Sequence, residues 1–123
     1  MKQYNYFFGV DVSKKTVDIT LSYDGTFSHQ KFTNDSNGMQ HLQDWFKELN
    51  LVFEQTLFCM EATGLYCFPL TNFLTANNID VWIENPSQIK KMTGLARGKN
   101  DKVDSQRIVL YATKHLDKLR LWR

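Results

Sequence analysis

Hydrophobic and polar residues alternate along the first third of the chain, as they do in β-strands. From Thr16 to Tyr23 every second residue is apolar, which is the period of a strand with one buried and one solvated face. Aromatic and β-branched residues fill Tyr4 to Val12, and a weaker alternation runs from Thr26 to Thr33. Asp24-Gly25 fits a two-residue type I′ hairpin turn, because glycine tolerates the positive φ that this turn requires. Three antiparallel strands are therefore predicted.

Beyond residue 33 the apolar residues recur at helical spacing, and helices then alternate with strands. Candidate caps at Asn34 to Ser36 precede an amphipathic helix that runs to about Asn50. The apolar run from Thr56 to Met60 fits a buried strand rather than a helix because it is short. A helix from Tyr66 to Asn77 and a strand from Ile79 to Glu84 are predicted to follow.

The last third of the chain is predicted to be helical. Asn85-Pro86 is a typical helix start and Gly94 a plausible stop. Leu95 to Asn100 is expected to form a loop, and a final helix should run from about Asp101 towards His115 or beyond. This order of elements predicts an α/β fold, in which three antiparallel strands and then βα units form a mixed five-stranded sheet with helices on both faces.

Length and composition narrow the class of protein. The chain has 123 residues, of which 42% are hydrophobic and 23% charged, so one globular domain is expected. The sequence contains no apolar run of the roughly 18 residues that a membrane span needs, and no membrane partner is expected. Cys59 and Cys67 lack metal-ligand spacing, which favours reduced core thiols in a cytoplasmic protein.

Charge is distributed unevenly along the chain. Residues 1–89 carry five Lys/Arg and ten Asp/Glu, whereas residues 90–123 carry ten Lys/Arg and three Asp/Glu; the net charges of −5 and +7 add to +2. A basic C-terminal third indicates a polyanionic partner such as nucleic acid. Six basic residues are predicted to contact phosphates: Lys90, Lys91, Arg97, Lys99, Lys102 and Arg107.

Four carboxylates form the candidate chemical site. Asp11 and Glu61 end the first and fourth predicted strands, and if these strands are parallel neighbours both side chains emerge at the same carboxyl edge of the sheet. Asp101 and Asp104 lie three residues apart at a helix start, on one face of that helix. Carboxylates at the ends of apolar strands need neutralisation, which Mg²⁺ supplies well. Four converging acids would suit two-metal phosphodiester chemistry.

Each of these residues also has a simpler interpretation. Asp11 could end its strand in a turn, and Glu61 could cap the following helix. Asp101 and Asp104 could be an N-cap and a favourable first-turn charge, and the lysines could form a solvated face. All of these would have to hold together with the charge asymmetry, so the metal site is favoured. The three histidines share no ligand spacing, and Ser13 has no partner base in the sequence.

Four segments, in this order, carry a resemblance to one protein family: GVDVSKKTVD (9–18), EATGLY (61–66), IENP (83–86) and GKNDKVDSQR (98–107). They resemble the N-terminal domain of the DEDD insertion-sequence transposases, the group that includes bridge-RNA-guided recombinases. The resemblance implies a RuvC-like, RNase H-type catalytic domain over residues 1–115. It also implies that four acids are catalytic and bind Mg²⁺ or Mn²⁺: Asp11, Glu61, Asp101 and Asp104. Further implied partners are DNA, a structured guide RNA and, in the intact enzyme, further copies of the chain.

The sequence departs from the family pattern in two respects. Asn100 and Ser105 stand where the family often has threonine and alanine. Family members also continue into a linker helix and a second domain, which supplies a serine thought to be the strand-transfer nucleophile. Residues 116–123 are therefore expected to start that linker helix, in a truncated gene or a cloned domain. The apolar residues of this segment, which are Leu116, Leu119, Leu121 and Trp122, are expected to pair with another chain.

Three other functions fit parts of the pattern. A stand-alone nuclease or Holliday-junction resolvase of the same fold would need no second domain. A nucleotide-binding lobe of the actin-like ATPases is suggested by GVDVSKK (9–15), although no second glycine-rich phosphate loop follows. A non-catalytic nucleic-acid-binding or dimerisation module would use the basic residues and have no need of metal.

Overall fold

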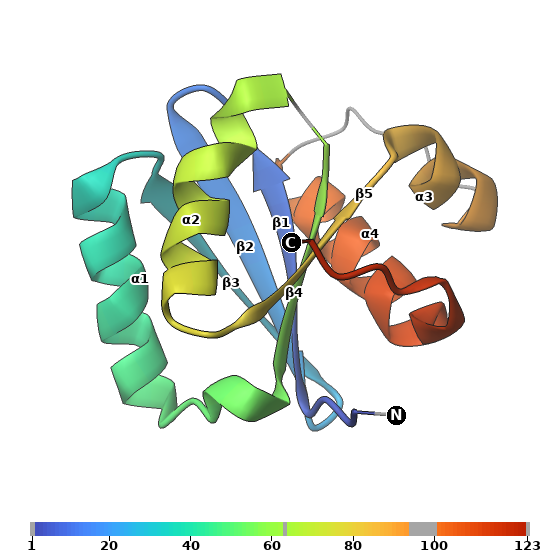
Figure 1. Cartoon of the computed structure of the whole chain (residues 1–123), viewed down its shortest axis with the longest axis horizontal. Coiled ribbons are helices and arrows are strands. Elements are labelled where there is room, and N and C mark those ends of the chain that lie inside the picture. The colour runs from blue at the N-terminus through green and yellow to red at the C-terminus, as the bar shows by residue number, and fades with distance from the viewer. Residues whose placement is uncertain (1, 63, 94–100, 123) are drawn as a thin grey trace.

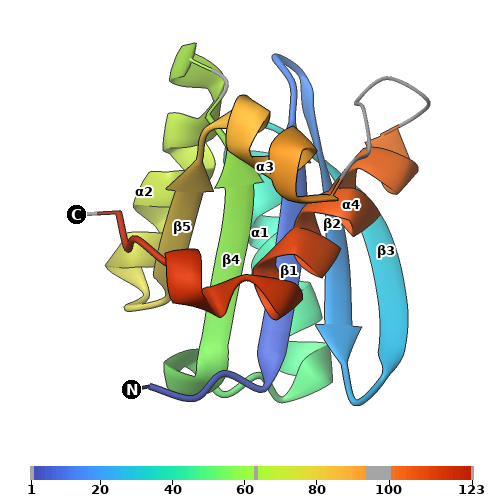
Figure 2. The same ribbon diagram turned by 90° about the vertical axis from the view of Figure 1, so that its right-hand side faces the viewer.

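A five-stranded mixed sheet forms the centre of the molecule. The computed structural model describes residues 2–62, 64–93 and 101–122, without the side chains of residues 91–93, 101 and 102. The strands are β1 (Tyr6–Val12), β2 (Thr16–Tyr23), β3 (Thr26–Thr33), β4 (Thr56–Glu61) and β5 (Asp80–Glu84), in the spatial order β3-β2-β1-β4-β5. β1 pairs antiparallel with β2 and parallel with β4. The predicted sheet is confirmed, including the parallel neighbours β1, with Asp11 as its second-last residue, and β4, which ends at Glu61 (Figure 2).

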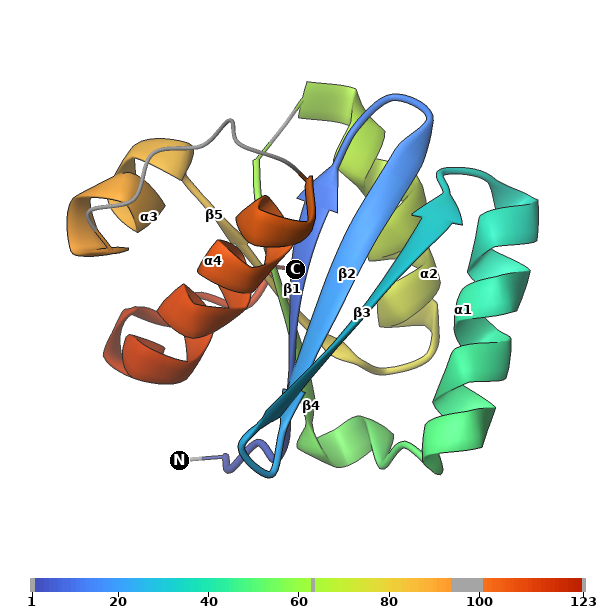
Figure 3. The same ribbon diagram turned by 180° about the vertical axis from the view of Figure 1, so that it is seen from behind.

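Helices cover both faces of the sheet, as predicted. Helices α1 (Ser36–Leu49) and α2 (Phe68–Ala76) lie against one face, and α3 (Pro86–Thr93) and α4 (Asp101–Lys114) lie on the other (Figure 1, Figure 3). Short 3-10 turns form at Phe53–Gln55, Gly64–Cys67 and Leu116–Lys118. In the described part of the chain, no helix combines the length and apolarity that a membrane crossing requires.

Each face of the sheet has its own apolar core. Phe8, Ile19 and Phe58 pack under α1 and α2, whereas Trp82 and Tyr111 belong to the cluster under α3 and α4. Strand residues alternate between the two clusters because successive side chains point to opposite faces. Both cysteines are buried free thiols, as expected from their spacing.

The local turn signals in the sequence behave as their chemistry predicts. Asp24 and Gly25 have φ of 51° and 78°, so both central residues of the hairpin take the positive φ of a type I′ turn. Of the three candidate caps for α1, Asp35 is the one that acts, since its side chain accepts a hydrogen bond from the Gly38 amide at 2.8 Å. Asn78 follows α2 with φ of 60°.

One face of β2 differs from the sequence prediction. The polar side of this strand was expected to face solvent, but Asp18 and Thr20 are buried because α4 packs across β1 and β2 (Figure 2). Thr20 Oγ1 lies 2.6 Å from Ser105 Oγ of α4. The Asp18 carboxylate and the Thr20 hydroxyl are therefore in the interior, although the alternation of apolar and polar residues along β2 predicts that they face solvent.

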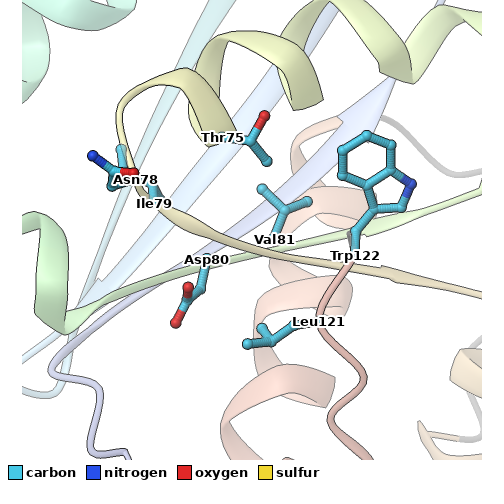
Figure 4. Close-up of a pocket in the computed structure, with 7 residues that line it drawn as sticks. All are labelled: Thr75, Asn78, Ile79, Asp80, Val81, Leu121 and Trp122. Atoms are coloured by element: carbon cyan, nitrogen blue, oxygen red, sulfur yellow. The ribbon is translucent and has the colours of Figure 1, made fainter.

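The end of the chain also differs from expectation. α4 ends at Lys114, and after one 3-10 turn the chain runs back beside β5 rather than continuing as a linker helix. Leu121 forms an antiparallel bridge with Trp82, and the Trp122 amide donates to Val81 O at 2.8 Å. A cavity of about 410 Å³ lies beside this tail, nearer the start of β5 than its end (Figure 4). The apolar residues expected to pair with another chain include three that pack on this chain's own core: Leu116, Leu119 and Leu121.

Candidate functional site

Four carboxylates lie side by side across the sheet on the face that α4 covers. Asp11 of β1 is the register partner of Asp18 of β2, and Glu61 of β4 is the register partner of Glu84 of β5. Val10 of β1 and Met60 of β4 are also register partners, and Asp11 and Glu61 each follow them by one residue. The pair Asp18 and Asp11 and the pair Glu61 and Glu84 therefore form one row across four strands. The row follows the carboxyl edge of β1, β4 and β5, where α/β sheets commonly bind ligands.

Contacts with α4 establish which face these acids occupy. Thr20 and Gly9, each two residues from an acid of the row, meet α4 at Ser105 and at Val109 respectively. Because alternate residues of a strand share a face, Asp18 and Asp11 lie on that side. Glu61 and Glu84 both bind side chains of α4 directly.

Three of the four predicted site acids have side chains that the structure describes, and all three are buried. Asp11 is 4% exposed and Glu61 and Asp104 are each 3% exposed, so three elements contribute buried carboxylates. The backbone of Asp101 begins α4, but its side chain lies outside the described residues. Within the described part of the chain, no three His, Cys, Asp or Glu side chains are grouped closely enough to hold a metal ion.

Arg107 is placed differently from its predicted role. It was expected to meet phosphates, yet it is 3% exposed and its Nη2 donates a hydrogen bond to Glu61 Oε1. Its Nε lies 4.0 Å from Asp104 Oδ1. The physical reason is that one turn of α4 carries Arg107 from Asp104 to the end of β4 and so brings its cation to buried acids that need one.

Of the predicted phosphate contacts, Lys90 is the one whose exposed side chain the structure describes. It lines a cavity of about 210 Å³ together with Glu61, Pro86, Ser87 and Arg107. Four of the predicted contacts lie outside the described side chains: Lys91, Arg97, Lys99 and Lys102. A cationic side chain of α3 therefore lines the same cavity as Glu61.

The sequence reasoning did not place Asp18 and Glu84 beside Asp11 and Glu61, which are their register partners. Asp18 accepts from His29 Nε2 at 2.8 Å and lies 3.6 Å from Lys31 Nζ. The available signal was its position, because a tight turn after β1 brings Asp18 opposite Asp11. The same contact with Asp18 gives the His29 ring a hydrogen-bond partner.

Glu84 occupies the other end of the row. Its Oε2 accepts from the Tyr111 hydroxyl at 2.9 Å, and its Oε1 accepts from the Asn85 amide at 2.9 Å. Burial and the hydrogen bond to Glu84 raise the pKa of Tyr111. Burial, reinforced by the charges of Glu84 and Glu61, also raises the pKa of the Cys59 thiol well above its usual range. This thiol is therefore protonated and is no nucleophile.

Two turns at the same edge are tied together by a single amide. Asn34 Nδ2 donates to Ser13 O and to Tyr66 O, both at 2.9 Å. The turn after β1 is thereby joined to the turn that follows β4. Leu65 and Tyr66 are exposed in the second turn, and Lys14 and Lys15 are exposed in the first. The edge therefore presents apolar and cationic side chains beside buried acids.

Comparisons with known proteins agree with this geometry. The chain is 29% identical over 111 residues to the pilin gene-inverting proteins of Moraxella bovis and Moraxella lacunata, covering 88% of this chain. It spans about a third (34%) of the length of these curated relatives.

The fold is that of RuvC. The RuvC structure of T. thermophilus with a Holliday junction substrate superposes with a TM-score of 0.64 at 10% identity, covering 97% of this chain and all of that one. The profile of the DEDD_Tnp_IS110 family, described as a transposase, matches residues 8–123. A match of this extent, on a RuvC-like fold with acids at the expected sheet edge, shows that the chain belongs to the IS110 family of DEDD transposases.

Proposed function

We propose that this chain is the metal-binding catalytic domain of a DNA transposase or invertase. Asp11, Glu61, Asp101 and Asp104 would hold Mg²⁺ or Mn²⁺. The observation that supports this is the position of Asp11 and Glu61 on neighbouring parallel strands at one sheet edge, together with the contact of Arg107 on α4 with Glu61, 4.0 Å from Asp104. The donor set fits the ion, since hard oxygen ligands are what Mg²⁺ prefers, and buried acids need a counter-charge. Bound there, the ions would stabilise the attacking and leaving oxygens of phosphodiester transfer.

DNA is the proposed substrate, and the basic residues near the acids are its proposed contacts. Family membership and the names of the Moraxella relatives support a role in DNA rearrangement. Lys90 would contact phosphates beside Glu61, together with Lys91, Arg97, Lys99 and Lys102 of the basic C-terminal third. A structured guide RNA, a second domain that supplies a serine, and assembly with further copies are proposed from the motif resemblance alone.

Titration with Mn²⁺ tests the metal assignment. Asp11→Asn keeps the shape of the side chain but removes its charge, and we expect Mn²⁺ affinity measured by calorimetry to fall by about tenfold or more. Asp44→Asn is the matched control, because Asp44 is an exposed acid on α1, on the other face of the sheet. Equal Mn²⁺ binding by the two variants would contradict the assignment.

A junction nuclease is a second candidate, because this chain covers the entire RuvC chain on which it superposes. It predicts that the 123-residue chain cuts four-way DNA junctions in Mg²⁺ and that Asp11→Asn abolishes cutting. Tight DNA binding by wild type without cleavage would instead favour the transposase domain, which in that proposal depends on further parts of a longer protein.

A further inference from the structure

We propose that Arg107 is the resident counter-cation of the carboxylate site and must leave Glu61 when a divalent ion binds there. This inference rests on the proposed metal site. Nη2 of Arg107 donates a hydrogen bond to Glu61 Oε1, and Nε of Arg107 lies 4.0 Å from Asp104 Oδ1. One guanidinium therefore contacts two of the predicted metal ligands. The side chain is 3% exposed. Water therefore does little to weaken these contacts.

Competition between Arg107 and a metal ion follows from the chemistry of the guanidinium. A guanidinium carries a permanent positive charge in proteins, so a second cation that arrives beside Arg107 meets a like charge. Like charges at contact distance in a buried site repel strongly. Mg²⁺ also needs the carboxylate lone pairs at fixed octahedral positions, and one oxygen of Glu61 is already taken. Arg107 therefore has to move.

The structure offers a place for the displaced guanidinium. Arg107 borders the cavity of about 210 Å³ that Glu61, Pro86, Ser87 and Lys90 also line. Its Nε is buried and finds no hydrogen-bond acceptor in the described part of the chain, so its present position leaves one donor unsatisfied. In the cavity the guanidinium would join Lys90 in a pocket with two cations. A phosphate there would satisfy the planar donor fork of Arg107.

This movement would couple the two ligands of the site. A metal ion at Glu61 frees Arg107 for phosphate, and a phosphate that holds Arg107 frees Glu61 for metal; the coupling is reciprocal because both act on one side chain. The arginine predicted from the sequence to bind phosphate would do so in the metal-bound protein.

Two substitutions at position 107 test the competition. Arg107→Met removes the charge and keeps most of the side-chain length, whereas Arg107→Lys keeps the charge. Because the competing cation is lost, we expect Arg107→Met to bind Mn²⁺ about tenfold tighter than wild type by calorimetry, and Arg107→Lys to stay close to wild type. If wild type binds Mn²⁺ and Arg107→Met binds it with equal or lower affinity, this inference is overturned, whereas the proposed metal site is not. No binding by wild type or either variant overturns the metal site and the inference together.

A second measurement needs only wild-type protein, in case Arg107→Met does not fold. The Nε–H of Arg107 is buried, so its ¹⁵N-resolved proton should exchange slowly with water in the absence of metal. Titration with Mg²⁺ alone is expected to shift this resonance and speed its exchange. Adding inorganic phosphate to the Mg²⁺-bound protein should shift it again. A resonance that stays unchanged while Mg²⁺ binds refutes the displacement of Arg107.

Discussion

Gly9 is the position where one methyl group should separate the two halves of the site. It lies in β1, two residues before Asp11, and faces the backbone of α4. A Cβ added at Gly9 would lie 2.3 Å from Val109 N and 2.4 Å from Ser105 O. Both are main-chain atoms of a helix, which cannot turn aside as a flexible side chain can. Ordinary contacts of a Cβ begin at 3.4 Å, so Gly9→Ala requires α4 to retreat by about 1 Å.

The size of the effect follows from what α4 carries. Overpacking of a well-packed core costs about 1–3 kcal/mol, and we expect the free energy of unfolding to fall by that amount. The same retreat moves Asp104 and Arg107 of α4 away from Glu61, which is on β4. Mg²⁺ requires oxygen ligands at about 2.0–2.1 Å, so a shift of about 1 Å should weaken metal binding by at least tenfold. Misplacement of that order costs about a hundredfold in rate when it reaches a catalytic group.

Urea unfolding and Mn²⁺ calorimetry on the folded protein together measure this prediction. Gly38→Ala is the matched control, because its Cβ would lie 1.6 Å from Thr33 O but belongs to α1 on the opposite face. Both variants should lose stability, and only Gly9→Ala should lose Mn²⁺ affinity. The reasoning is refuted if Gly9→Ala binds Mn²⁺ as wild type does, or if Gly38→Ala weakens binding equally after correction for the folded fraction.

Three further predictions concern residues around the site and the first helix. Asp35→Ala should lower the free energy of unfolding at neutral pH. Hydrogen bonds from a threonine hydroxyl and a backbone amide lower the carboxyl pKa below 3.8, so the difference from wild type should vanish as pH falls through the folded-state pKa; a difference that persists in acid contradicts the cap. Thr20→Val should cost about 0.5–1.5 kcal/mol by urea unfolding, because it removes the buried hydrogen bond between the Thr20 and Ser105 hydroxyls, and the double variant with Ser105→Ala should cost less than the sum. Asp18→Asn should weaken Mn²⁺ binding far less than Asp11→Asn, since a histidine and a lysine of β3 already hold Asp18; an equal loss would make Asp18 a metal ligand.

The local elements were predictable because their causes lie within a few residues. Alternation along β2, the Asp24-Gly25 turn and the cap at Asp35 depend on backbone geometry that neighbouring residues dictate. The parallel pairing of β1 with β4 was also expected, since it follows from the order of strands and helices. From this order alone, Asp11 and Glu61 could be placed at one sheet edge.

The side chains that contact each acid could not be predicted from the sequence in this way. Asp18 and Thr20 have the spacing of a solvent-facing side, and only the packing of α4 makes that side an interior. The aromatic and apolar residues at the end of the chain carry no signal that they return to β5 rather than continue as a helix. Such contacts join residues far apart in sequence, and their energy depends on shape and burial rather than on local propensity.

The sequence by itself determined the order of elements, the edge at which the acids meet and the family to which the chain belongs. Only the tertiary structure decided which charges face each other: Asp18 against β3, Glu84 against Tyr111, and Arg107 against Glu61. The physical reason is that the sequence does not distinguish an arginine on the exposed side of a helix from one on its buried side, because the rest of the fold decides which side is buried. Burial removes the water that would otherwise satisfy the guanidinium, and its nearest carboxylate then becomes its partner.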